Sequence, residues 1–342
     1  MTRKRIMDIR MICKIALIAT LSSWYACDWF LPGYKFEEGS LPDRPVNLVD
    51  FNTVYDDYNS TAPTLGDLIP FCFSTNRKSQ GKDFDIIFEP MNVRFDKKTG
   101  KLEVLNDYAN WSSRQQEYEV IETGLKKIGT VGNELGPNLL AILDLYEYKF
   151  TLLYSTDITG DAQINFISNQ TSADFSQPRE IRYLNSTEDD MYPTFNPDQS
   201  KIYFCSNRNG KDFNFYYVNL GITQDLEKSL SDTVQYEVYM DSILSSRQDD
   251  KCPFILDNIL VFASDRDGGF GGFDLYYSIL EKGKWGIPVN FGSRINTGAD
   301  EYRPILIDER VSSNQIMLVF SSNRHGGRGG FDLYFVGIEN EL

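Results

Sequence analysis

A short phrase recurs five times along this chain of 342 residues, and the repetition restricts the fold more than any single residue does. The two best-preserved copies are VFASDRDGGFGGFDLYYSIL (261–280) and LVFSSNRHGGRGGFDLYFVG (318–337). Weaker copies lie at 69–88, 152–167 and 202–220. Each copy is an apolar strand, a polar corner, a turn that usually contains Gly, and a second apolar strand. Self-similarity of this kind indicates a repeat architecture.

Two positions inside the phrase recur and are expected to be structural. The corner carries an arginine in four copies and Ile158 in the other: Arg77, Arg208, Arg266 and Arg324. The second strand opens on an acid or amide: Asp85, Asn165, Asn214, Asp274 and Asp332. Aromatic residues at the step before this strand (Phe84, Phe213, Phe273 and Phe331) are interpreted as packing between sheets rather than as a ligand platform.

A repeated carboxylate precedes four of the copies. It stands three residues before a proline, as Glu134, Asp190, Asp250 and Glu301. The first copy offers Pro63 with Ser60 at that position, which is a poor match. If the strand that follows is the innermost of each unit, these acids ring one mouth of a central channel.

The repeats predict an all-β fold, a five-bladed β-propeller with cores at about 63–88, 137–167, 193–220, 253–280 and 304–337. Outer segments follow two copies, and a third such segment, RPVNL (44–48), stands near the N-terminus. We expect it to close the last blade, because rings of blades avoid an open sheet edge. A sixth blade would have to lie in 89–125, which more plausibly extends the outer hairpin of blade one with its turn at 96–101.

The stretch PTFNPDQSKIYFCSNRNGKDFNFYYV (193–218) combines a proline, an NPD turn, an apolar strand and an SNR corner. In these features it resembles the TolB-type, WD40-like (PD40) β-propeller repeat of bacterial envelope proteins. The resemblance covers roughly residues 45 to 340 and implies an envelope protein. TolB-like propellers usually have six blades, so a six-bladed fold is the alternative.

The N-terminus resembles a bacterial lipoprotein signal. A basic start is followed by the short apolar run IALIATLSSWYA (15–26), which is too short to span a bilayer. The resemblance implies removal of residues 1–26, lipidation of Cys27, a tether over 27–43 and a propeller over 44–342. An ordinary signal peptide cut elsewhere is the alternative. The expected location is the outer membrane, on its periplasmic or cell-surface face.

The net charge of the chain restricts the kinds of partner that it can bind. The chain has 34 basic and 49 acidic residues, a net charge of −15, and the signal segment carries more basic than acidic residues. Such a charge argues against nucleic acid and against broad contact with anionic lipid headgroups. Membrane attachment would then depend on the lipid anchor.

Few residues of the chain suggest a catalytic or metal-binding site. The single histidine, His325, lies in a Gly-rich turn, and no familiar catalytic or metal motif is present. We expect no cofactor and no metal. Ca²⁺ at Asp265, Asp267 and Asp274 is disfavoured, because their spacing is not that of a calcium loop. For the repeated carboxylates, a structural role is favoured over ligand binding or catalysis, since a repeated residue usually has a repeated structural task.

These observations lead to the prediction of a non-enzymatic scaffold or accessory subunit of an outer-membrane secretion, assembly or uptake complex, with envelope proteins as partners. Tyr108, Trp111 and Tyr118 are its candidate partner surface, and a decorated outer hairpin is the alternative there. The rival function is a glycan-binding or glycan-hydrolysing propeller that uses the channel-mouth carboxylates.

Overall fold

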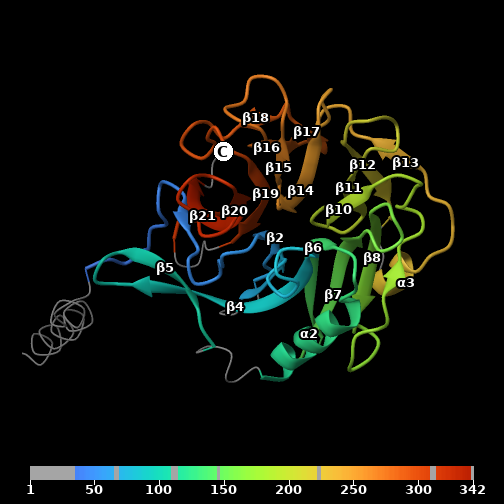
Figure 1. Cartoon of the computed structure of the whole chain (residues 1–342), viewed down its shortest axis with the longest axis horizontal. Coiled ribbons are helices and arrows are strands. Elements are labelled where there is room, and N and C mark those ends of the chain that lie inside the picture. The colour runs from blue at the N-terminus through green and yellow to red at the C-terminus, as the bar shows by residue number, and fades with distance from the viewer. Residues whose placement is uncertain are drawn as a thin grey trace, which may run out of the picture.

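The protein, described by a computed structural model over residues 35–64, 69–108, 115–144, 147–221, 225–308 and 313–339, is a ring of five antiparallel sheets. Figure 1 looks down the ring and shows β2, β6, β10, β14 and β19 nearest its centre. The five-bladed all-β propeller is therefore confirmed.

Each blade runs outward from its innermost strand, in chain order. Blade one is β2 (Asp57–Thr61), β3 (Ile69–Thr75), β4 (Asp85–Asp96) and β5 (Lys101–Asn106). Blade two is β6 (Glu134–Asp144), β7 (Glu147–Thr156), β8 (Gln163–Ser168) and β9 (Arg179–Glu180). Blade three is β10 (Asp190–Phe195), β11 (Lys201–Ser206), β12 (Asn214–Asn219) and β13 (Val238–Met240). Blade four is β14 (Asp250–Leu256), β15 (Ile259–Ser264) and β16 (Asp274–Glu281), with β17 (Lys284–Trp285) and β18 (Val289–Asn290) both pairing with β16. Blade five is β19 (Glu301–Ile307), β20 (Gln315–Ser322) and β21 (Asp332–Glu339).

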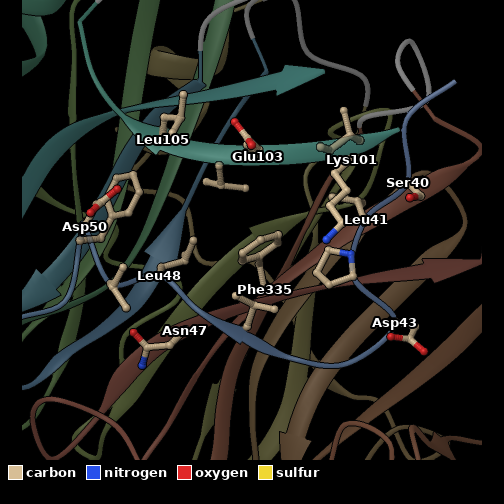
Figure 2. A pocket seen from close by; sticks show the side chains of 16 residues that line it. Ser40, Leu41, Asp43, Asn47, Leu48, Asp50, Lys101, Glu103, Leu105 and Phe335 are labelled. Carbon is tan, nitrogen blue, oxygen red and sulfur yellow. The ribbon is translucent and has the colours of Figure 1, made fainter. Parts of the chain in front are cut away.

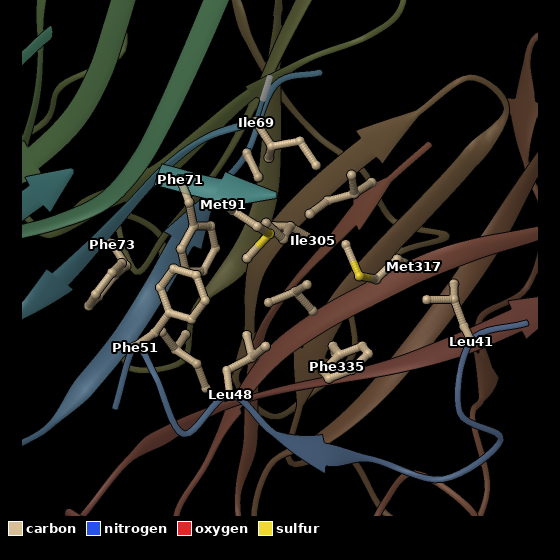
Figure 3. Packing of buried hydrophobic residues seen from close by; sticks show 14 of the residues in the cluster. Leu41, Leu48, Phe51, Ile69, Phe71, Phe73, Met91, Ile305, Met317 and Phe335 are labelled. Atoms are coloured by element: carbon tan, nitrogen blue, oxygen red, sulfur yellow. The ribbon is translucent and has the colours of Figure 1, made fainter. Parts of the chain in front are cut away.

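The N-terminal segment closes the ring, as its sequence predicts. Strand β1 (Val46–Asn47) pairs antiparallel with β21 and supplies the outer strand of blade five. A buried apolar cluster fills the seam between blades five and one behind it (Figure 3). Leu48 and Phe51, which follow β1 in the chain, are buried in this cluster. The closing strand is therefore stabilised by the burial of these two side chains as well as by its two paired residues.

Neighbouring blades are joined by one polar contact that occurs at all five junctions. The side chain of the residue just before each innermost strand accepts a backbone N–H from the preceding blade, at the position just before or near the start of that blade's third strand. In blade three, Asp189 Oδ1 accepts from Ala162 N at 2.8 Å. The N–H of the same Asp189 donates to Asn207 Oδ1, at the corner of its own blade. The equivalent acceptors in the other blades are Asp56, Asn133, Asp249 and Asp300. The polar corners of the repeat therefore connect one blade to the next.

The segment after blade one differs in part from expectation. The outer hairpin β4–β5 turns at 97–100 as predicted and projects beyond the ring (Figure 1). Helix α2 (Gln115–Ile128) was not predicted, although Tyr118, Ile121, Leu125 and Ile128 give it an apolar stripe at helical spacing. It packs between blades one and two. A second, short helix is α3 (Leu226–Leu230).

Blade one begins earlier than its sequence suggested. Its innermost strand is β2, which precedes the expected core at 63–88, so Asp57 is the residue equivalent to Asp190. In blade two, Gln163 rather than Asn165 opens the third strand, because Gln163 pairs with Thr156. Both shifts arise where the phrase is least well preserved.

The three described cysteines, Cys72, Cys205 and Cys252, are free and buried. Within the described ranges, no helix is long and apolar enough to cross a membrane. Residues 1–34, and with them Cys27 and the expected signal segment, lie outside the described part of the chain.

Candidate functional site

The repeated carboxylates open the innermost strands, and four of the five blades bury the acid in the same ion pair. Each acid contacts the arginine at the corner of its own blade. The N···O distances are 2.7 Å for Asp57–Arg77, 2.6 Å for Asp190–Arg208, 2.5 Å for Asp250–Arg266 and 2.9 Å for Glu301–Arg324. The acid side chains are fully buried, so none of them faces an open channel mouth.

The surroundings of these pairs are also repeated. In blade five, Glu301 accepts hydrogen bonds from the N–H and the hydroxyl of Thr297, four residues before it. Arg324 donates to the Ile295 carbonyl and lies over the rings of Phe320 and Tyr334 at about 5 Å. Charge-assisted hydrogen bonds of this kind fix the turn that leads into each innermost strand.

Glu134 is the exception. Ile158 stands at the corner of blade two, so this buried acid has no arginine partner. Its Oε1 accepts from Thr130 Oγ1 at 2.5 Å, and its Oε2 has no hydrogen-bond partner. Burial, with smaller contributions from the nearby carboxylates Asp85 and Asp157, raises the pKa of Glu134 to about 7.

The two neighbouring acids are held differently. Both oxygens of Asp157 accept from Asn133, one from its backbone N–H at 2.7 Å and one from its amide at 2.6 Å. Asp85 lies 3.8 Å from Lys78 and keeps about a fifth of its side chain exposed. The junction of blades one and two thus brings together three carboxylates in three different environments.

Aromatic rings surround the axis on the face where the innermost strands begin. We call this set the mouth belt, and it consists of Phe84, Tyr58, Phe331, Tyr302, Phe273 and Phe213, with Lys251 between the last two. Consecutive ring centroids from Phe84 to Phe273 are 4.8–6.4 Å apart, and the Lys251 ammonium lies 4.1 Å from the ring centroid of Phe213. Every member is partly exposed. The aromatic steps therefore pack between blades, as expected, and also form a partly exposed surface.

The mouth belt is interrupted at blade two. Ala162 occupies the position that holds a phenylalanine in the other four blades, because its carbonyl accepts from the first residue of the next inner strand as theirs do. Leu135 stands where Tyr58 and Tyr302 stand in blades one and five. The interruption is in the same blade as the unpaired Glu134.

Several cavities lie away from the mouth belt in the described part of the chain, and two of them are lined by more than one blade. The larger, of about 850 Å³, is at the rim between blades five and one and is lined mainly by apolar residues of the β1 segment, β5 and β21 (Figure 2). Its acid Glu103 is engaged by Arg94 at 2.7 Å. The second, of about 400 Å³, lies where the innermost strands end and is lined by all five blades, from Thr61 to Leu306.

The remaining predicted residues do not gather at one site. Asp265 Oδ1 accepts from Asp249 N, and Asp274 Oδ2 accepts from Phe270 N and Asn290 Nδ2. No group of three or more residues suited to a metal ion is found in the described part of the chain. His325 is exposed in its turn.

The candidate partner surface is only partly described. Tyr118 packs against Phe88, with ring centroids 5.3 Å apart, and donates to Glu122. Tyr108 meets Tyr118 edge to face. Trp111 lies outside the described residues.

The fold is shared with solved glycoside hydrolases. A thermostable family-43 glycoside hydrolase superposes with a TM-score of 0.50 at 12% identity, covering 84% of this chain and 92% of that one. An α-L-arabinofuranosidase from Lactobacillus brevis also gives 0.50, at 8% identity, covering 85% and 94%. No family model and no curated protein matches the sequence.

These comparisons correct two sequence-based interpretations. The assignment to TolB-type PD40 repeat proteins is wrong, because the two solved structures named above that share this architecture are glycoside hydrolases, and five rather than six blades are present. The prediction of a non-enzymatic scaffold was built on that assignment, and it is wrong for the same reason. Strand-corner-strand phrases describe how a blade is built, and different propellers meet the same structural demands.

Proposed function

We propose that this chain is a glycan-cleaving propeller in which the mouth belt binds sugar and Glu134 donates a proton to the leaving oxygen. The observation that carries the proposal is the coincidence in blade two: the missing arginine, the interrupted belt and a buried acid whose pKa is raised to about 7. A repeated structural task explains four of the acids and does not explain this one.

Glu134 has the property that a general acid needs. A carboxylic acid keeps its proton near neutral pH only if its surroundings disfavour the charged form, and glycoside hydrolysis pairs such an acid with an ionised carboxylate. Asp85 is our candidate for that second carboxylate, because it is near enough to affect Glu134 and is partly exposed. The turn Thr130–Gly132, exposed at Thr130 and Val131, lies over Glu134 and must move aside for substrate to reach it.

The mouth belt supplies a binding surface of suitable chemistry. Aromatic rings present flat apolar faces with a negative quadrupole, against which the C–H faces of sugars can pack. The likeness to solved glycoside hydrolases at 8% and 12% identity carries the architecture alone, and it is in keeping with this proposal.

The experiment is a hydrolysis screen of the full chain with released sugars measured by chromatography. Polysaccharides with arabinofuranosyl side chains come first, since one of the similar structures is an α-L-arabinofuranosidase. We expect Glu134→Gln to lower the rate about 10²–10⁴-fold, and Glu103→Gln, at an exposed surface acid, to leave it unchanged. Phe331→Ala should raise KM.

Two outcomes would overturn parts of the proposal. Sugar release by Glu134→Gln at the wild-type rate would remove Glu134 from the reaction. Binding of a glycan that depends on Phe331, without release of sugar from any substrate, would show a glycan-binding propeller instead.

The sequence-based location also stays a proposal. We propose that the chain is an outer-membrane lipoprotein anchored through Cys27. Mass spectrometry of the mature N-terminus tests this: a diacyl or triacyl cysteine as first residue is expected, and an unmodified N-terminus at another position would refute it.

A further inference from the structure

The axis of the propeller is closed by side chains at one level. Each innermost strand has a bulge, and its first residue has positive φ in all five blades: Asn59 (56°), Gly136 (60°), Tyr192 (57°), Cys252 (60°) and Arg303 (48°). The next residue is a proline in four blades and Ser60 in blade one. The bulges place four different side chains and the glycine of blade two at equivalent positions around the axis.

Arg303 crosses this level and is fully buried. Its guanidinium donates to the Pro253 carbonyl of blade four at 3.3 Å and to the Pro137 carbonyl of blade two at 2.7 Å. It also lies over the ring of Tyr192, 5.5 Å from its centroid. Within the described ranges, no carboxylate pairs with it, although a buried charge without a counter-charge is costly.

The nearby groups that could carry negative charge do not do so. Burial raises the pKa of the Cys252 thiol to about 11, even though Arg303 lowers it, so the thiol is neutral at ordinary pH. Burial likewise raises the pKa of Tyr192 and of Tyr302. Burial lowers the pKa of Arg303 itself, but a guanidinium is so basic that it keeps its proton at ordinary pH. The axis therefore holds an uncompensated positive charge.

Three donors at this level lack partners. They are Nε of Arg303, Nδ2 of Asn59 and Oγ of Ser60, all buried, and the acceptor Oδ1 of Asn59 is buried without a partner as well. The innermost strand of blade one packs against those of blades five and two. Arg303 of blade five reaches the Pro137 carbonyl of blade two, so the strand that carries Asn59 and Ser60 lies between the two ends of this contact. The Asn59 N–H donates to Ser321 of blade five, which places Asn59 at that junction. Buried donors without partners are rare in folded proteins.

From this donor set we propose that the axis of the propeller binds a small monovalent inorganic anion, chloride in physiological media. Arg303, Asn59 and Ser60 would each donate one hydrogen bond to it, and the anion would neutralise Arg303. The site joins blades five, one and two, so its occupancy stabilises the closed ring. This inference is independent of the proposed glycan chemistry.

Anomalous diffraction from crystals of the full chain grown in bromide tests the site directly. We expect one bromide peak within hydrogen-bonding distance of Arg303 Nε and Ser60 Oγ. A water-like density there with no anomalous signal would overturn the proposal, whatever any variant does.

A solution test uses thermal unfolding of the wild type at constant ionic strength, with chloride replaced by gluconate, which is too large to enter. A ligand that binds only the folded state raises the Tm in a saturable way. We expect Tm to rise with chloride in the wild type and the response to be much weaker in Ser60→Ala, which removes one donor and leaves the backbone unchanged. The matched control is Ser313→Ala, a buried serine of the β19–β20 connection, in which the chloride response persists. Equal Tm values in chloride and gluconate would refute the anion site.

Discussion

The pH dependence of stability gives a sharp prediction for Glu134→Gln. In the folded protein the pKa of this acid is raised from its ordinary 4.5 to about 7. Between these two values the folded state holds a proton that the unfolded state has released, so the free energy of unfolding falls as pH rises. The stability contributed by the protonated Glu134 is fully present below pH 4.5 and is lost as the pH rises through about 7.

The magnitude follows from the pKa values. The difference between 4.5 and about 7 corresponds to up to about 3 kcal/mol. The turn over Glu134 is exposed, and screening there reduces the expected effect to about 2 kcal/mol. Glutamine cannot ionise, so Glu134→Gln should lack this loss and be more stable than the wild type above pH 7.

The assay is urea unfolding of both proteins at a series of pH values, with the difference in free energy of unfolding plotted against pH. We expect the difference to grow by about 2 kcal/mol in favour of Glu134→Gln between pH 4.5 and pH 8. The matched change Glu301→Gln removes the negative charge from the contact with Arg324 and should destabilise without gaining stability as pH rises. A pH-independent difference between Glu134→Gln and the wild type would refute the reasoning.

Two further predictions concern the repeat. Arg266→Met leaves Asp250 buried without its partner and should lower the free energy of unfolding by about 3–5 kcal/mol in urea titrations; a loss below about 1 kcal/mol would contradict the ion-pair account. Gly136→Ala adds a Cβ 2.4 Å from the ring of Tyr192 at a φ of +60°, whereas Gly160→Ala has positive φ but open space. Gly136→Ala should lower the Tm much more than Gly160→Ala does. Equal shifts in Tm would show that the Tyr192 ring does not constrain Gly136.

The closing strand and the blade count were predictable because they depend on recurring patterns. RPVNL (44–48) carries the outer-strand phrase in a place where no blade precedes it, and the last copy lacks an outer segment. A ring needs both. Alternating strands with corner residues specify this architecture through local preferences alone.

Blade one shows where pattern reading fails. Ser60 stands where the other blades have proline, so the alignment was anchored on Pro63 and Asp57 was missed. A usable signal was present: Thr53 precedes Asp57 by four residues, as Ser186 precedes Asp190. Helix α2 was missed because strands dominate the rest of the chain.

The two proposed sites were hidden for a different reason. The sequence shows that Ile158 replaces an arginine, but only packing shows that Glu134 is buried without a substitute partner. Arg303 is one polar residue in an apolar strand, and its position across the axis depends on five bulges from distant parts of the chain. Such properties of long-range geometry cannot be read from local patterns.

The most direct test of the proposed glycan cleavage is the pH dependence of kcat/KM on a substrate from the hydrolysis screen. The account predicts turnover by the wild type that declines above about pH 7 as Glu134 loses its proton, and loss of that turnover in Glu134→Gln. Turnover that is unchanged in Glu134→Gln, or absent with every glycan tested, would contradict it.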